Sequence, residues 1–271
     1  MRGEPGMSKP HNDDRARPRP RLPISRQRLV ELAVVVFGVL IGLGLDNLVE
    51  EVRLRGDARE LERAFQHDIL GAIQNSWERQ AVYKCLTERL HSLTEQALSR
   101  DGTWEAAPAV SNGSIPVAVP APYRSPIRQW MTVSFDRALG TEAFKRIPRE
   151  RANAYAVLFS SIAWSREGNG EEYQALARLA PLAYPMADVD NQVRADMLQA
   201  LSQLDRDRAL ALVQANQFIA LAMIIPDTNT VRGGLLEQRA MYDEAARSLE
   251  VTYGACFDRS ATDRLMSLAS K

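Results

Sequence analysis

Apolar residues recur along much of the chain at steps of three and four, the spacing that places side chains on one face of an α-helix. In the first half, this series runs through Leu54, Ala58, Leu61, Phe65, Ile69 and Ala72, and again through Leu86, Leu90, Leu93 and Ala97. The spacing predicts one long helix that ends near residue 100, where Asp101 and Gly102 supply a stop signal.

The most apolar stretch precedes this series, at residues 29–51 (LVELAVVVFGVLIGLGLDNLVEE), and residues 32–45 are uncharged. Ten of those fourteen residues are Leu, Ile, Val or Phe, which favours membrane insertion by roughly 3 to 6 kcal/mol. A buried core helix and a cleaved signal peptide are the alternatives. The polar residues Asp46 and Asn47 follow in place of a small-residue cleavage site. We therefore predict an uncleaved transmembrane helix at 29–50.

Five prolines and two glycines between residues 101 and 126 predict a long loop, which we interpret as a packed cover. Further helices are expected at 126–140, 148–168, 171–184, 190–225 and 235–254. The apolar stretch 209–225 is interpreted as a core helix, because Gln214, Asn216 and Gln217 interrupt it. The predicted fold class is all-α, with an N-terminal transmembrane helix that continues into a long helix packed with a C-terminal helical bundle.

The formal charges of the chain cancel, but they are unevenly distributed. Residues 1–28 hold eight Lys and Arg against three Asp and Glu, which leaves 26 against 31 in the rest. The Arg- and Pro-rich tail at 1–28 is expected to be disordered. The acidic remainder at 29–271, which includes the helical extramembrane domain predicted at 51–271, argues against nucleic-acid binding. Four arginines shortly before the apolar stretch against two after it predict a cytoplasmic tail and an exported domain.

Residues 29–78 have a recurring form: Glu, an aliphatic run, Gly-Val-Leu, a second aliphatic run, Asp-Asn and then a charged helix (RLRGDARELERAFQHDILGAIQNS). This opening resembles that of a large group of uncharacterised bacterial single-span proteins. The resemblance implies a bacterial inner-membrane protein with its C-terminal domain in the periplasm, and it implies no activity.

The two cysteines, Cys85 and Cys256, are disulfide candidates. An even number of cysteines in an exported domain favours pairing, and two buried free thiols are the alternative. Gly38 and Gly42 form a G-x-x-x-G pair in the apolar stretch, which would let a second copy pack closely as a homodimer. The frequency of glycine in membrane helices is the other explanation.

The sequence carries no recognisable catalytic, metal or cofactor motif, so no site residue, metal or cofactor of these kinds is predicted. His67 and His91 are 24 residues apart on one predicted helix, too far to share a metal, and we expect both to be solvated. The run Asp205-Arg206-Asp207-Arg208 is interpreted as a solvated face. The four tryptophans are expected in the core, and lining a groove is the alternative: Trp77, Trp104, Trp130 and Trp164.

The leading hypothesis is a membrane-tethered helical module that binds an unknown protein or small-molecule partner without catalysis. The alternative is an envelope enzyme whose site is assembled only in three dimensions, with the Pro-rich loop as a lid. An inverted, cytoplasm-facing adaptor is the third. A concave pocket with two or more perturbed acids would favour the enzyme.

Overall fold

The computed structural model describes residues 26–99, 104, 109–110, 119–120, 125–186, 189–224 and 228–271, and it divides into two units, Met1–Val52 and Arg53–Lys271. Most of the predicted tail and most of the Pro-rich loop lie outside the described residues. Among the described residues, eight α-helices account for nearly all regular structure, so the all-α prediction is confirmed.

In the first unit, the described residues form the start of helix α1 (Arg26–Leu98). The large apolar side chains from Leu29 to Val52 are all exposed, between 47 and 68 %. An 18-residue window of mean hydropathy 2.3 lies in this helix, and the fold buries none of it. Of the described helices, α1 alone is long and apolar enough to cross a membrane by length and composition.

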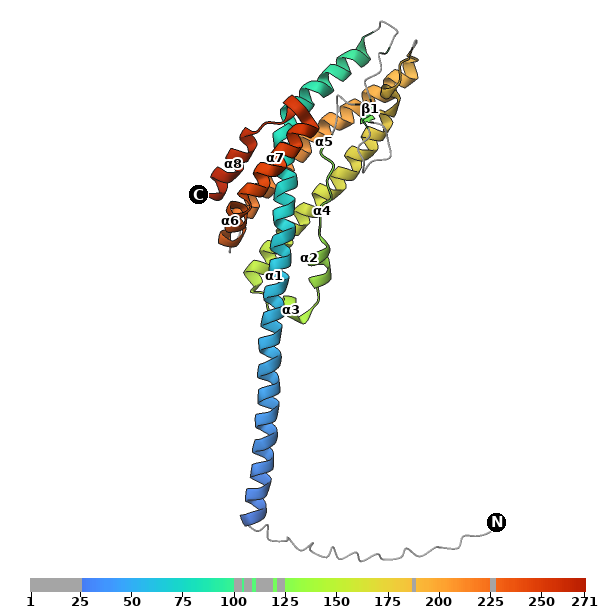
Figure 1. Cartoon of the computed structure of the whole chain (residues 1–271). Coiled ribbons are helices and arrows are strands. Elements are labelled where there is room, and N and C mark those ends of the chain that lie inside the picture. The colour runs from blue at the N-terminus through green and yellow to red at the C-terminus, as the bar shows by residue number, and fades with distance from the viewer. Residues whose placement is uncertain are drawn as a thin grey trace, which may run out of the picture. The chain divides into compact units, whose positions relative to one another are not determined.

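In the second unit, the remainder of α1 packs against the C-terminal helices, as predicted (Figure 1). Helices α4 (Arg149–Arg178) and α5 (Asn191–Ile224) lie side by side. Arg178 binds Gln203, whereas Gly168 faces Gln214, so the two helices run antiparallel. The 3-10 helix η1 (Ala180–Ala183) lies between them along the chain.

One aromatic cluster packs α1 against the next three helices of this unit. Phe65 of α1 makes edge contacts with Phe135 of α2 (Val133–Ala138), Phe144 of α3 (Glu142–Lys145), and Tyr155 and Phe159 of α4, at ring-centroid distances of 5.1 to 6.3 Å. Such edge contacts stabilise the packing beyond the area that they bury.

The C-terminal elements are α6 (Thr228–Glu237), α7 (Arg239–Tyr253), the 3-10 helix η2 (Gly254–Cys256) and α8 (Ser260–Ala269). They pack on α1 through Trp77, whose ring lies 5.3 Å from Tyr242 and 5.7 Å from Phe257. A two-residue ladder joins β1 (Ala109–Val110) to β2 (Val119–Pro120), and Trp104 pairs with Met186 through backbone hydrogen bonds.

Several of the predicted helix boundaries are wrong. The helix expected at 126–140 starts at Val133, because Ser125–Thr132 is irregular. The break expected at Gly168-Asn169-Gly170 does not occur, because α4 continues through it with α5 packed alongside. The helix expected at 235–254 is split between α6 and α7, and α8 was not predicted. The C-terminal end of α1 and both ends of α5 lie within two residues of their predicted positions.

Candidate functional site

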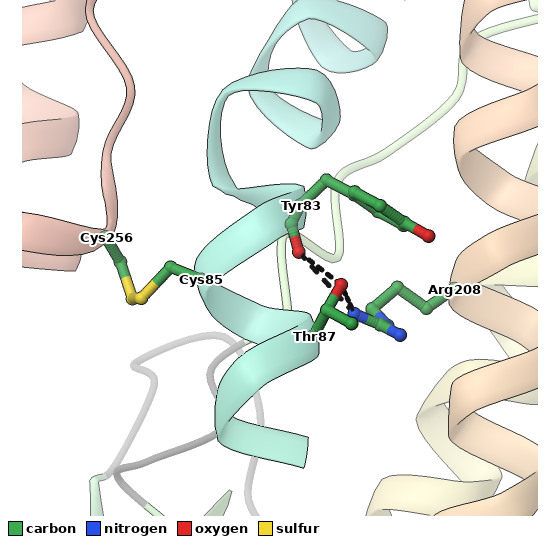
Figure 2. Close-up of a disulfide and its surroundings, with 5 residues drawn as sticks. All are labelled: Tyr83, Cys85, Thr87, Arg208 and Cys256. Atoms are coloured by element: carbon green, nitrogen blue, oxygen red, sulfur yellow. Dashed lines mark hydrogen bonds between the residues drawn. A yellow bond between two sulfur atoms is a disulfide. The ribbon is translucent and has the colours of Figure 1, made fainter. Parts of the chain in front are cut away.

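A disulfide joins Cys85 of α1 to Cys256 of η2, as the sequence predicted, with 5.1 Å between the two Cα atoms (Figure 2). This distance lies in the usual range for such bonds. Beside the bond, the Asp258 backbone N–H donates to the Ala81 carbonyl at 2.9 Å. The end of the chain is thereby attached to the middle of α1. The bond is consistent with an oxidising compartment.

The opposite side of α1 faces Arg208 of α5 (Figure 2). This guanidinium is 5 % exposed, lies 5.0 Å from the Tyr83 ring centroid and donates to the Thr87 hydroxyl and Asp205. The solvated face predicted for residues 205–208 is therefore wrong at Arg208. It is also wrong at Asp207, which is 9 % exposed and whose pKa is raised by burial.

Next to Arg208, a small cavity of about 10 Å³ is lined by Arg79, Glu172 and several apolar residues. Its volume is about what one water molecule requires. Nε of Arg208 has no hydrogen-bond partner within the part of the chain that the structure describes. The cavity is therefore too small for an organic ligand, and its polar groups belong to the interior of the fold.

A buried ion pair lies at the centre of the second unit. Arg79 of α1 is 7 % exposed and donates from Nη2 to the carboxylate of Glu172 of α4 at 2.9 Å, where Glu172 is 2 % exposed. The same guanidinium donates to Asn169, and the Ser125 hydroxyl donates to Glu172. These contacts connect α1, α4 and the segment before α2. Burying two charges requires such dense pairing, because desolvation alone is strongly unfavourable.

A second carboxylate, Glu78, holds Arg128 in place. Arg128 donates to both Glu78 oxygens at 2.7 and 2.8 Å, and the Tyr253 hydroxyl of α7 donates to Oε1 at 3.0 Å. The hydrogen bond with Glu78 raises the pKa of Arg128. Asn169 also donates from Nδ2 to the Arg128 carbonyl at 2.6 Å. Arg128 is therefore fixed at both its backbone and its guanidinium, while its side chain stays about half exposed at 47 %.

Arg128 and Asn169 both line a groove of about 700 Å³. One wall is the segment 127–133, and the other is a face of α4. The α4 residues are spaced as successive positions on one helix face: Arg166, Asn169, Gly170 and Tyr173. A Cβ built on Gly170 would meet nothing within 4 Å, so this position of the lining has room for a side chain. The groove, with the ion-pair network beneath it, is the candidate functional site.

Sequence reasoning missed this site, although a signal for it existed. The apolar series of α1 includes Ala72 and Leu86, and Arg79 lies seven residues from each. A heptad step keeps a residue on the same helix face. Arg79 therefore occupies a core-facing position, and a charged residue there indicates a buried partner. No spacing in the sequence identifies Glu172 as that partner.

Of the other predicted positions, Trp130 lines the groove. The sites of Gly38 and Gly42 are open, since an added Cβ would meet nothing within 4 Å at either. His67 and His91 are exposed, as expected, and the described residues contain no cluster suited to a metal ion. Trp77, Trp104 and Trp130 are in the core, whereas Trp164 is 55 % exposed, so the core prediction is wrong for that residue.

Comparison with protein-family models, curated proteins and solved structures finds no match to this chain.

Proposed function

We propose that this chain is a membrane-tethered, non-catalytic binding module whose exported helical domain holds a ligand in the groove between residues 127–133 and α4. The groove carries the proposal. Its volume of about 700 Å³ lies in the range of small-molecule sites. The ion pairs beneath it fix Arg128 and Asn169, and such pre-organisation lowers the entropy lost on binding.

The tether rests on the apolar start of α1. Exposed Leu, Val, Ile and Phe side chains over residues 29–52 are unfavourable in water and favourable in lipid. The arginines before this stretch support a cytoplasmic N-terminus. The Cys85–Cys256 disulfide supports a domain in the oxidising periplasm and argues against the inverted adaptor.

The enzyme alternative would need a concave site with perturbed acids. The lining of the groove includes no carboxylate in the described part of the chain, and both buried glutamates of the network are bound by arginine. A binding module therefore accounts for the groove with fewer assumptions. A homodimer through Gly38 and Gly42 is compatible with the module and would pair two copies in the bilayer.

Two cysteine variants test on which side of the membrane the helical domain lies and whether the groove holds a ligand in the cell. Met131→Cys places a thiol on the groove wall, and Val157→Cys places one on α4 outside its lining; the native side chains are 48 and 51 % exposed. Both native cysteines are in the disulfide, so each variant would carry a single free thiol. The rate of alkylation by a membrane-impermeant reagent is measured in intact cells and on the purified full chain.

We expect both variants to react from outside the cell. The Met131→Cys thiol should react more slowly in cells than after purification, whereas Val157→Cys should react at the same rate in both. Labelling only by a permeant reagent would refute the exported orientation. An unchanged Met131→Cys to Val157→Cys rate ratio would show that the groove is empty in the cell, and the binding function would be abandoned.

A further inference from the structure

The charges around the groove indicate what kind of ligand it holds. Two arginines, Arg128 and Arg166, line it, and no carboxylate does so among the described residues. Arg128 is neutralised by Glu78 from beneath, just as Arg79 is neutralised by Glu172. The formal charges of these four side chains sum to zero. They therefore add rigidity to the groove without adding net charge.

Arg166 differs from the other arginines of this network. It is exposed on α4, and it has no carboxylate within ion-pair distance among the described residues. Its Nη1 donates to the Thr132 hydroxyl at 3.0 Å, and that hydroxyl donates to Asp136 at 2.7 Å. Asp136 thus offsets Arg166 through a hydroxyl and not by direct contact. The guanidinium keeps further N–H groups for a ligand, since it carries five in all.

The remaining lining supplies apolar area. Ile127, Met131 and Val133 belong to the lining on one side, and Tyr173 belongs to it on the other. Met131 and Val133 are 48 and 42 % exposed, so a ligand that covers them gains burial. A guanidinium that no described carboxylate contacts directly, beside an apolar wall, is complementary to a molecule that has one anionic end and an apolar body.

We infer that the groove binds a small organic anion, a carboxylate or a phosphate ester on an apolar body, through the Arg166 guanidinium. This inference rests on the proposed function and specifies the ligand class of the same groove. A planar guanidinium can engage both oxygens of such a group in a bidentate contact. Arg128, held by Glu78 and Asn169, positions the wall opposite Arg166.

The test compares two matched probes on the purified full chain in a non-ionic detergent. The probes are 4-(trifluoromethyl)benzoate and the neutral 4-(trifluoromethyl)benzyl alcohol, followed by ¹⁹F NMR titration. Binding to the Gly170→Leu variant, whose added side chain should obstruct the groove, is subtracted together with a detergent blank. What remains is groove-specific binding. Inorganic phosphate is added as a competitor to separate recognition of the anion from recognition of the apolar body.

The benzoate should bind about tenfold or more tightly than the alcohol, because only it makes a charge-assisted contact. Arg166→Gln should remove that preference, and Arg166→Lys should retain part of it. Arg149→Gln is the matched control: it removes the same charge from an exposed residue of the same helix, about 25 Å away along α4, and should change nothing. Phosphate should compete weakly with the benzoate.

The failures of the two proposals are distinguishable. Equal groove-specific binding of both probes, unaffected by Arg166→Gln, would overturn the anion class and leave the binding groove in place. Absence of groove-specific binding by either probe would also overturn the anion class, and the thiol-labelling rates of Met131→Cys would then decide whether the groove is a binding site at all. A thermal melt of each variant confirms that Arg166→Gln is folded.

Discussion

Arg79 and Glu172 form the most heavily desolvated ion pair described in the fold, at 7 and 2 % exposure. Glu172→Gln would leave the Arg79 charge buried without a counter-charge, at a cost of about 3 to 5 kcal/mol in the free energy of unfolding. Replacing both, as Arg79→Met with Glu172→Leu, should cost less than the single change, because no charge stays behind. Urea unfolding followed by tryptophan fluorescence measures both values.

An exposed pair provides the control for that experiment. Lys145 and Glu142 of α3 lie 2.6 Å apart at the surface, with 61 and 65 % of their side chains exposed. Solvent screens such a pair, so Glu142→Gln should leave stability nearly unchanged. Equal losses from Glu172→Gln and Glu142→Gln would show that burial does not set the strength of the Arg79 contact.

Asp207 should destabilise the fold at neutral pH. Burial raises its pKa, partly offset by Arg206 and by a hydrogen bond from Gln203. An acid whose pKa is higher in the folded state costs stability above that pKa, and the cost disappears as pH falls below the ordinary aspartate value. Asp207→Asn should therefore raise the free energy of unfolding by roughly 0.5 to 1 kcal/mol at neutral pH.

The pH dependence separates this cause from others. Urea unfolding of wild type and Asp207→Asn is compared at neutral pH and near pH 3.5, about the ordinary aspartate range. The advantage of the variant should shrink at the acidic pH, because Asp207 is then protonated in the folded chain. An advantage of the same size at both values would mean that charge burial is not responsible.

At the scale of elements, the glycines of α4 offer a direct test of the uninterrupted helix. Gly170 is helical, and an added Cβ would meet nothing within 4 Å. Gly170→Ala should stabilise the protein by about 0.5 to 1 kcal/mol through helix propensity and unfolded-state entropy. Gly140 has φ +84° after α2, so Gly140→Ala should destabilise by about 1 kcal/mol.

Thermal unfolding of the two alanine variants measures whether Gly170→Ala raises the stability and Gly140→Ala lowers it. If α4 were broken at Gly168-Asn169-Gly170, Gly170→Ala would not stabilise the chain. An added Cβ at Gly170 would meet nothing within 4 Å. Alanine at this position should therefore narrow the groove only slightly, whereas leucine should obstruct it. The same position therefore tests both the helix and the groove.

At the scale of the whole molecule, the disulfide closes a loop with a sequence separation of 171 residues. Chain entropy gives a loss of at most about 5 kcal/mol when both cysteines are replaced by alanine, and measured losses for native bonds are about 2 to 5 kcal/mol. We expect Cys85→Ala with Cys256→Ala to lower the urea midpoint and to remove the response of the wild type to reducing agent. Hydrogen exchange should rise first in α7 and α8, which the bond attaches to α1.

A different pattern of exchange would contradict this account. If reduction loosened α4 and α5 as much as α7 and α8, the bond would be supporting the whole unit. The aromatic contacts of Phe65 lie far from Cys85 along α1. We therefore expect hydrogen exchange in α4 to change little when the bond is reduced. Trp77 still packs on Tyr242 and Phe257 without the bond, so the C-terminal helices should loosen without detaching completely.

The sequence by itself determined the helical class, the long α1 with its apolar start, the limits of α5 and the pairing candidates Cys85 and Cys256. These features depend on local periodicity, stop signals and residue counts, which act over a few turns of chain. The glycines that predicted a helix end within α4 did not end it, because packing against a neighbouring helix favours the helix there. The glycines at 168 and 170 are poor helix formers, yet α5 supports the helix across them.

Only the tertiary structure decided which charged side chains are buried and which partners they contact. Glu172 is 93 residues from Arg79, and Arg128 is 50 residues from Glu78, so no local pattern links them. An apolar face can be identified from its own helix, because every apolar residue on it has the same preference for burial. An ion pair requires two specific groups at one point, and that depends on how α1, α4 and the segment between residues 125 and 132 pack together.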